Sequence, residues 1–77
     1  MTANDIIQLL DAAPFVPFRI HLTNGQTYDV PHRDFVWVER NRLLIAKPSP
    51  KSDRSMERVD FVSLLHVESV APLERAA

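Results

Sequence analysis

The chain has 77 residues and no cysteine, with 45% hydrophobic and 25% charged residues and a formal net charge of −1. This composition is typical of a folded domain rather than a disordered chain, and the lack of cysteine excludes disulfides and thiolate metal sites. A net charge near zero gives no long-range attraction to nucleic acid or to anionic membranes. Residues 1–11 lack the basic region of a signal peptide, and no apolar run approaches the roughly 20 residues of a membrane span. We therefore expect a cytoplasmic protein without a membrane partner.

The length indicates one domain, covering residues 1–77. A chain of this size buries only about 60–65% of the surface that its unfolded form exposes. Small domains without disulfides or metals often gain stability by oligomerising. The size alone is therefore a reason to expect a homo-oligomer.

The first segment predicts a helix over residues 2–13. Thr2 can cap the first turn with Asp5 three residues later, and apolar residues then recur at helical spacing. Pro14 cannot continue the helix. The apolar stripe is expected to cover the protein's own barrel, and a docking face for a partner is the alternative.

The second segment predicts a β-hairpin. Phe18, Ile20 and Leu22 alternate with polar residues and lead to Asn24-Gly25, which is a strong hairpin signal. After this turn Tyr28 and Val30 are expected on the inner face, with the residues between them facing solvent.

The rest of the chain predicts further short strands. Residues 31–34 form a bend, 35–38 and 43–46 are strands joined by a polar turn, 47–55 is a loop, and 56–59 is a strand. Asp60 is expected to cap a short 3₁₀ or helical turn over 61–65, before a last strand over 66–70 that Pro72 ends. The sum is one N-terminal helix and about five strands, which favours a small five-stranded antiparallel barrel over 18–71 and a tail over 72–77.

This order of elements resembles the Sm-like family, and within it the Hfq-like bacterial RNA chaperones. A helix precedes the segment Ile20-His21-Leu22-Thr23-Asn24-Gly25, and the ending Val67–Pro72 is similar to that family's last strand. The resemblance implies a ring of subunits that binds RNA. However, the Tyr-Lys-His signature that helps line the family's RNA-binding pore is replaced in 60–65 by a mainly apolar segment that begins with the acid Asp60, so no RNA-contact residue is carried over. The chain is also similar to short bacterial proteins of no known activity that share Pro17-Phe18-Arg19-Ile20, Asn24-Gly25 and Leu64-Leu65-His66.

Basic residues are concentrated in the segment 39–58, which contains six basic and three acidic residues. Such a rim on a small barrel can contact phosphates, and exposed Trp37 or Tyr28 would add base stacking. Ordinary charges on a solvated loop are the alternative and are favoured over RNA binding. The candidate nucleic-acid residues are Arg40, Arg42, Lys47, Lys51, Arg54 and Arg58.

Metal binding and catalysis find little support in the sequence. His21, His32 and His66 are not paired at ligand spacing. Ser69 and His66 would point to opposite faces of a strand, so direct activation of a nucleophile is not expected. We expect no enzyme activity, no metal and no cofactor.

Large apolar residues exceed what the inside of one small barrel needs. The surplus either packs under the helix or forms an interface between copies, and unpaired edge strands would allow edge-to-edge pairing. We expect a non-enzymatic, self-associating binding module, with a further protein partner also possible, and a Sm-like RNA-binding protein as the alternative. The candidate interface residues are Phe35, Trp37, Leu44, Phe61 and Leu64.

Overall fold

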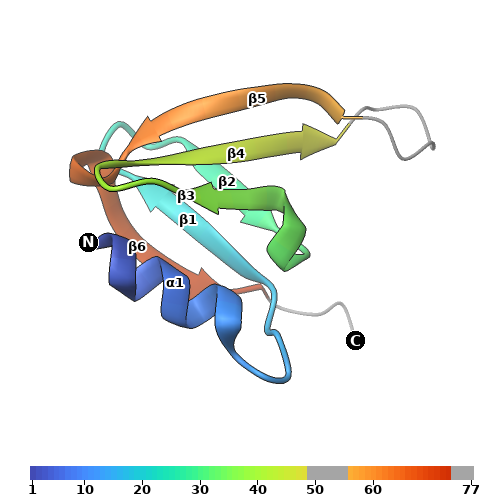
Figure 1. Cartoon of the computed structure of the whole chain (residues 1–77). Coiled ribbons are helices and arrows are strands. Elements are labelled where there is room, and N and C mark those ends of the chain that lie inside the picture. Colours follow the sequence, from blue (N-terminus) through green and yellow to red (C-terminus); the bar gives the residue numbers. More distant parts are fainter. Residues whose placement is uncertain (49–55, 74–77) are drawn as a thin grey trace.

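The computed structural model describes residues 1–48 and 56–73, which form one helix and two small antiparallel sheets (Figure 1). In chain order the elements are α1 (Ala3–Asp11), β1 (Phe18–Leu22), β2 (Thr27–Val30), η1 (Arg33–Phe35), β3 (Val36–Val38), β4 (Arg42–Pro48), β5 (Met56–Ser63), η2 (Leu64–His66) and β6 (Val67–Pro72). The predicted class, mostly β with one N-terminal helix, is confirmed.

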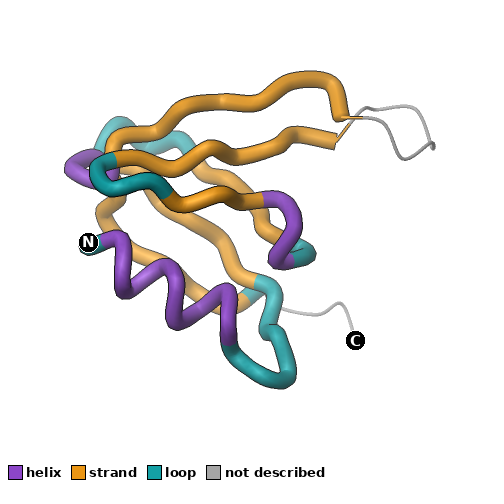
Figure 2. The backbone as a smooth tube through the Cα atoms, in the orientation of Figure 1, coloured by secondary structure: helices purple, strands orange, loops and turns teal. Residues whose placement is uncertain are grey.

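The strands are divided equally between the sheets. One has the order β2-β1-β6 and the other β3-β4-β5. Within the described residues no ladder joins the two sheets, so the predicted closed five-stranded barrel is not seen. Figure 2 shows the sheets facing each other, with α1 running along one side of the space between them.

Helix α1 begins as its sequence predicts. The Thr2 hydroxyl accepts from the Asp5 amide at 3.2 Å, and the Asp5 carboxylate accepts from the Thr2 amide at 2.9 Å, which completes a capping box. Donation to the carboxylate from the Thr2 amide, followed by that from the Thr2 side chain, lowers the pKa of Asp5 below its ordinary value. The helix ends at Asp11, two residues before the predicted end, because Pro14 disfavours helical backbone before it.

The predicted hairpin and the facing of its residues are confirmed. Gly25 has a φ of 90°, a left-handed conformation that favours glycine, and the Asn24 side chain accepts from the Gln26 amide at 2.9 Å. Ile20 lies opposite Tyr28 and Phe18 opposite Val30. All four of these side chains are buried, because alternation places them on one face.

The core lies between the inner faces of the two sheets and the helix. It joins Ile6 and Leu10 of α1 to the inward residues of the strands, and Phe15, Phe35 and Val70 pack at its margin. No helix within the described part of the chain is long and apolar enough to cross a membrane.

One predicted turn was wrong in position. β5 continues through Ser63, so 61–63 are strand and only Leu64–His66 form a 3₁₀ turn. Asp60 pairs with Ile45 in the ladder and does not cap the turn. Instead the Ser63 hydroxyl accepts from the Leu65 amide at 3.3 Å. The ladder to β4 holds this segment extended, and Val62 and Leu64 both enter the core. The loop predicted over 47–55 and the tail predicted over 72–77 both start too early, because Lys47 and Pro48 belong to β4 and Pro72 belongs to β6. Residues 49–55 and 74–77 of these predictions lie outside the described residues.

Candidate association surface

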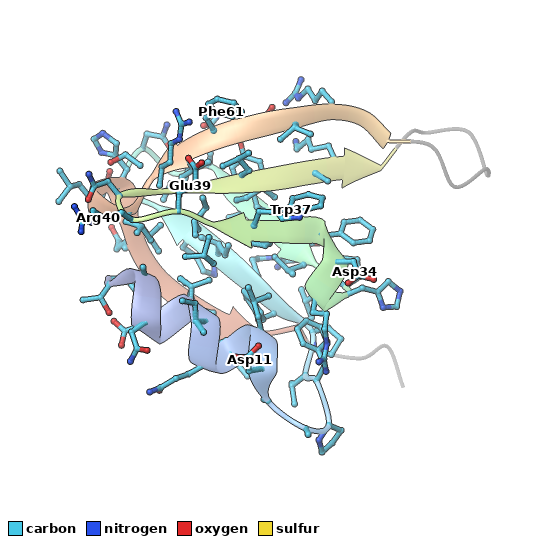
Figure 3. All side chains as sticks on the ribbon, viewed as in Figure 1. Asp11, Asp34, Trp37, Glu39, Arg40 and Phe61 are labelled. Atoms are coloured by element: carbon cyan, nitrogen blue, oxygen red, sulfur yellow. The ribbon has the colours of Figure 1, made fainter. Side chains whose placement is uncertain are left out.

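The outer face of the sheet β3-β4-β5 carries a row of large apolar side chains. Trp37 lies opposite Leu44, and Leu44 lies opposite Phe61, so the three stand side by side across three strands. We call Trp37, Leu44 and Phe61 the apolar row. Trp37 is 54% exposed and Phe61 61% exposed, and Figure 3 shows them on β3 and β5. An exposed group of this kind is typical of an interaction surface.

Two further apolar residues extend the outer surface from the apolar row toward the N-terminal end of β5. Ala46 lies opposite Val59 in the register, and alternation along each strand places both on the same face as Leu44 and Phe61. Val59 is 47% exposed. Val59 was not among the predicted interface residues, since the sequence was divided into a strand ending there and a turn after it. The alternation Val59-Asp60-Phe61 was the signal that could have identified it.

A charged pair borders the apolar row on its other side. Arg42 donates from its guanidinium to the Glu39 carboxylate, and the same guanidinium lies 4.5 Å from the centroid of the Phe61 ring. Cation–π contact and ion pairing together fix Arg42 across the strands. The rim of the row is therefore charged but locally balanced, as the polar rim of a protein interface is.

The remaining predicted interface residues lie elsewhere. Leu64 is buried in the core at 5% exposure, and Phe35 of η1 is half-buried and packs at the core's margin. Neither adds to the exposed surface. Of the five predicted positions, the structure brings Trp37, Leu44 and Phe61 together on one accessible face.

A polar cluster joins the two sheets on the inner face of β5, opposite to the face that carries Phe61. The Tyr28 hydroxyl donates to Asp60 Oδ2 at 2.6 Å, and Arg58 Nε lies 2.9 Å from Asp60 Oδ1. The Lys47 ammonium lies 5.1 Å from the centroid of the Tyr28 ring. Burial and, after it, the bond to Asp60 raise the pKa of Tyr28 to about 12. Donation from Tyr28, followed by that from Arg58, lowers the pKa of Asp60.

The predicted basic rim is thus divided among several environments. Arg42, Arg58 and Lys47 each contact a carboxylate or an aromatic ring of the chain itself. Arg40 is exposed, and Lys51 and Arg54 lie outside the described residues. Cations that already have partners would have to exchange them to bind phosphate, which weakens the net attraction.

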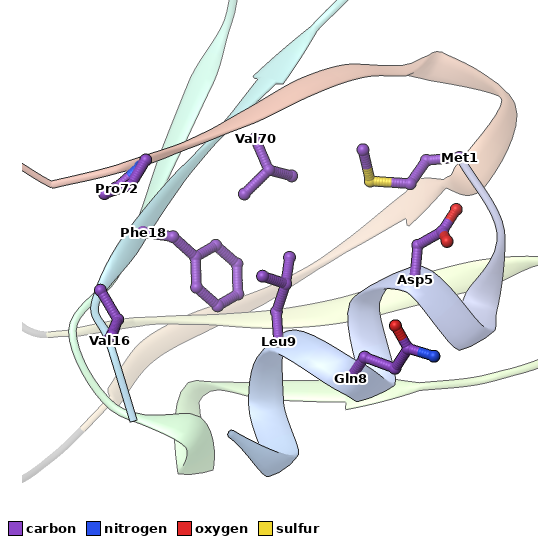
Figure 4. Close-up of a pocket in the computed structure, with 8 residues that line it drawn as sticks. All are labelled: Met1, Asp5, Gln8, Leu9, Val16, Phe18, Val70 and Pro72. Carbon is purple, nitrogen blue, oxygen red and sulfur yellow. The ribbon is translucent and has the colours of Figure 1, made fainter. Parts of the chain in front are cut away.

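An apolar groove of about 580 Å³ separates α1 from β1 and β6 (Figure 4). The side chains of Leu9, Phe18 and Val70 form its centre. Asp5 lies on its rim, where the helix cap already holds the carboxylate. The groove is therefore hydrophobic and brings no reactive group to a bound molecule.

The three histidines lie apart from one another. His21 lies opposite Ser69 on the outer face of the sheet β2-β1-β6, and His32 precedes η1, with its ring 5.9 Å from that of Phe35. His66 is exposed at the end of η2. No group of three potential metal ligands is found among residues 1–48 and 56–73.

Comparison with known proteins returns nothing to set beside this geometry. No protein family matches the chain, and no curated protein and no solved structure is significantly similar to it.

Proposed function

We propose that this protein is a self-associating binding module that acts without catalysis, and that copies meet through the apolar row. The observation that carries the proposal is the exposure of Trp37 and Phe61 on one face of a sheet. Aromatic side chains provide much of the free energy of protein association, and Trp is among the residues most often dominant. A lone exposed apolar residue needs no explanation, but a row across three strands does.

Light scattering at several protein concentrations tests the proposal. We expect the wild-type mass to exceed that of one chain and to fall on dilution. Trp37→Ser and Phe61→Ser should shift the dissociation to higher concentration. Leu65→Ser is the matched control, because Leu65 is 88% exposed yet lies in η2, away from the apolar row. A strictly monomeric wild type at every concentration would refute self-association.

RNA binding by a Sm-like barrel is the second candidate function. It is favoured by one observation, the exposure of Trp37 and Phe61 beside Arg42, since aromatic rings next to cations form platforms for unpaired bases. Against it, Glu39 and Asp60 neutralise two of the cations that this hypothesis needs. We therefore place it second.

Fluorescence anisotropy with labelled single-stranded RNA distinguishes the two functions. The RNA hypothesis expects binding that weakens steeply with salt, since each phosphate contact releases counterions. Neutralising Arg40, Lys51 and Arg54 to Gln should weaken it further, while Arg19→Gln in the other sheet should not. If the protein binds no RNA even at low salt, the RNA hypothesis is rejected and the self-association proposal is untouched.

A further inference from the structure

We infer that the association is a two-fold dimer in which β5 of one copy pairs antiparallel with β5 of a second copy, with Phe61 opposite Phe61. The inference rests on the proposed self-association and names its geometry. It follows from three features of β5: the direction of its backbone groups, the lack of protection on its free edge, and the distribution of its side chains.

Hydrogen-bonded and non-hydrogen-bonded pairs alternate along the ladder between β4 and β5. This alternation fixes the direction in which each backbone N–H and C=O group of β5 points. The Leu64 amide donates to the Asn41 carbonyl at 3.0 Å, so these two residues form a hydrogen-bonded pair. Ile45–Asp60 is therefore bonded, and Val59 and Phe61 direct their N–H and C=O groups away from β4.

The opposite side of β4 gives an independent check of this alternation. The Glu39 amide donates to the Arg42 carbonyl at 2.9 Å, which makes Trp37–Leu44 a bonded pair between β3 and β4. The backbone groups of Leu44 then point to β3. They are unavailable to Phe61, its partner on the other side. Both ladders agree that Phe61 offers its backbone to a strand beyond the edge.

The other free edges are poor sites for adding a strand. β3 has three residues and β2 has four, and β6 contains a register shift and ends in Pro72, which has no N–H. Short strands, bulges, proline and charged side chains are the usual protections of an edge. On β5 the charges of Arg58 and Asp60 already pair with each other. β5 has eight residues and the sequence MERVDFVS, without proline. Within the described part of the chain it pairs with β4 alone.

The side chains of β5 are self-complementary about Phe61. A two-fold axis at Phe61 sets Val59 of one copy opposite Ser63 of the other, so the residues that face each other on the outer side between positions 59 and 63 carry no charge. The charges of Arg58 and Asp60 lie on the other face and pair with each other. Because the axis is perpendicular to the sheet, the two apolar rows join into one row of six side chains across six strands. A second copy of this chain is therefore the partner that the edge fits.

Disulfide trapping tests the register directly, since the natural chain has no cysteine. Opposed residues in the proposed pairing have Cα atoms about 5.5 Å apart, within the range of a disulfide. We expect Phe61→Cys to cross-link with itself under mild oxidation. An equal mixture of Val59→Cys and Ser63→Cys, which keeps Phe61, should cross-link between the two variants.

The matched controls are the same cysteines taken singly. Val59→Cys alone and Ser63→Cys alone place their sulfurs four residues out of register, about 13 Å apart, and should not cross-link within the dimer. Leu65→Cys reports on random collision. The mixture should cross-link about 100-fold faster than Leu65→Cys, given an effective concentration near 1 mM within the dimer and about 10 μM protein.

The outcomes separate the two levels of the proposal. A wild type that is monomeric by light scattering overturns both the self-association and the dimer. A wild type that associates, but whose mixture cross-links no faster than Leu65→Cys, overturns β5 pairing alone and points to contact face to face or through β6. Cross-linking of Val59→Cys with itself would show a shifted register and would also overturn the inference.

Discussion

The two sheets share one inner design and differ on their outer faces. Both direct buried aliphatic residues inward, with Ile20 on β1 and Ile45 on β4 almost completely covered. Outside, β1 presents Arg19, whose guanidinium lies 2.6 Å from the carboxylate of Asp29 on β2. The corresponding surface of β4 carries Leu44 between two exposed aromatic rings.

This difference shows which outer face is stable in contact with water and which would gain free energy by being covered. The charges of Arg19 and Asp29 balance each other, and the hydrogen bond from Arg19 lowers the pKa of Asp29. The apolar row gains free energy only when it is covered, at about 25 cal/mol per Å². We therefore expect association on the sheet β3-β4-β5.

The largest expected effect tests the shared inner design. Ile20→Ala and Ile45→Ala each remove a covered side chain, and each should lower the free energy of unfolding by about 2–5 kcal/mol. Urea denaturation of the two variants at one protein concentration measures this. If one sheet tolerated the change without loss, the two inner faces would not be equivalent.

The outer faces should respond differently in association. Phe61→Ser is expected to weaken the dimer by about 2 kcal/mol, or about 30-fold in the dissociation constant, because Phe61 lies at the centre of the contact between the two β5 strands. Sedimentation equilibrium measures the constant. Thr27→Ser, a conservative change on the outer face of β2, is the control and should leave it unchanged. An equal effect of both would remove the contrast between the faces.

The contact between the sheets comes next in size. Tyr28→Phe deletes the hydroxyl that donates to Asp60, a hydrogen bond to a charged group, and should cost about 1.5–3 kcal/mol of unfolding free energy. The control is Phe15→Leu at the margin of the core, which leaves the polar cluster intact. No loss in Tyr28→Phe would mean that the sheets hold together without this bond.

The same variant should change the dependence of stability on pH. The folded-state pKa of Tyr28 is raised from 10.0 to about 12, so its contribution is complete below pH 10 and is lost as the pH rises toward 12. The pKa of Asp60 is lowered, so its contribution is present above the unfolded value near 4 and is lost as the pH falls. Denaturation curves at several pH values should show both slopes reduced in Tyr28→Phe.

The smallest effect is expected on the polar face. Asp29→Asn removes the ion pair with Arg19, which is exposed and screened by water. The unfolding free energy should change less than in Tyr28→Phe, and the change should shrink further in high salt. A larger loss would show that the polar face contributes more to folding than its exposure indicates.

Local signals made the first half of the chain predictable. The cap of Thr2 with Asp5, the turn at Gly25 and the alternation from Phe18 to Leu22 each depend on neighbours in sequence, and each is seen in the structure. The position of the 3₁₀ turn was not predictable in the same way. Whether residues 61–63 are strand or turn depends on pairing with β4, which is a tertiary contact and not a propensity.

The sequence predicted an exposed apolar surface, but it did not predict which residues form it. An apolar surplus was evident in the sequence, yet Trp37 lies outside and Leu64 lies inside. The pairing of β3 decides which way Trp37 faces, and the position of the 3₁₀ turn after β5 decides the facing of Leu64. The pairing of Arg42 and Arg58 with nearby acids was equally hidden, because it depends on rotamers and on strand partners.

The first sheet of the chain is completed by its last strand, since Phe18 of β1 lies opposite Pro72 of β6. Contacts between residues so far apart in sequence form late and slow folding, because the intervening chain must be ordered first. Until then β1 has a partner on one side only, and its other backbone edge is open to any strand it meets. During synthesis the hairpin of β1 and β2 therefore stays half-paired until β6 has left the ribosome. This delay is the period in which the protein is most exposed to misassembly.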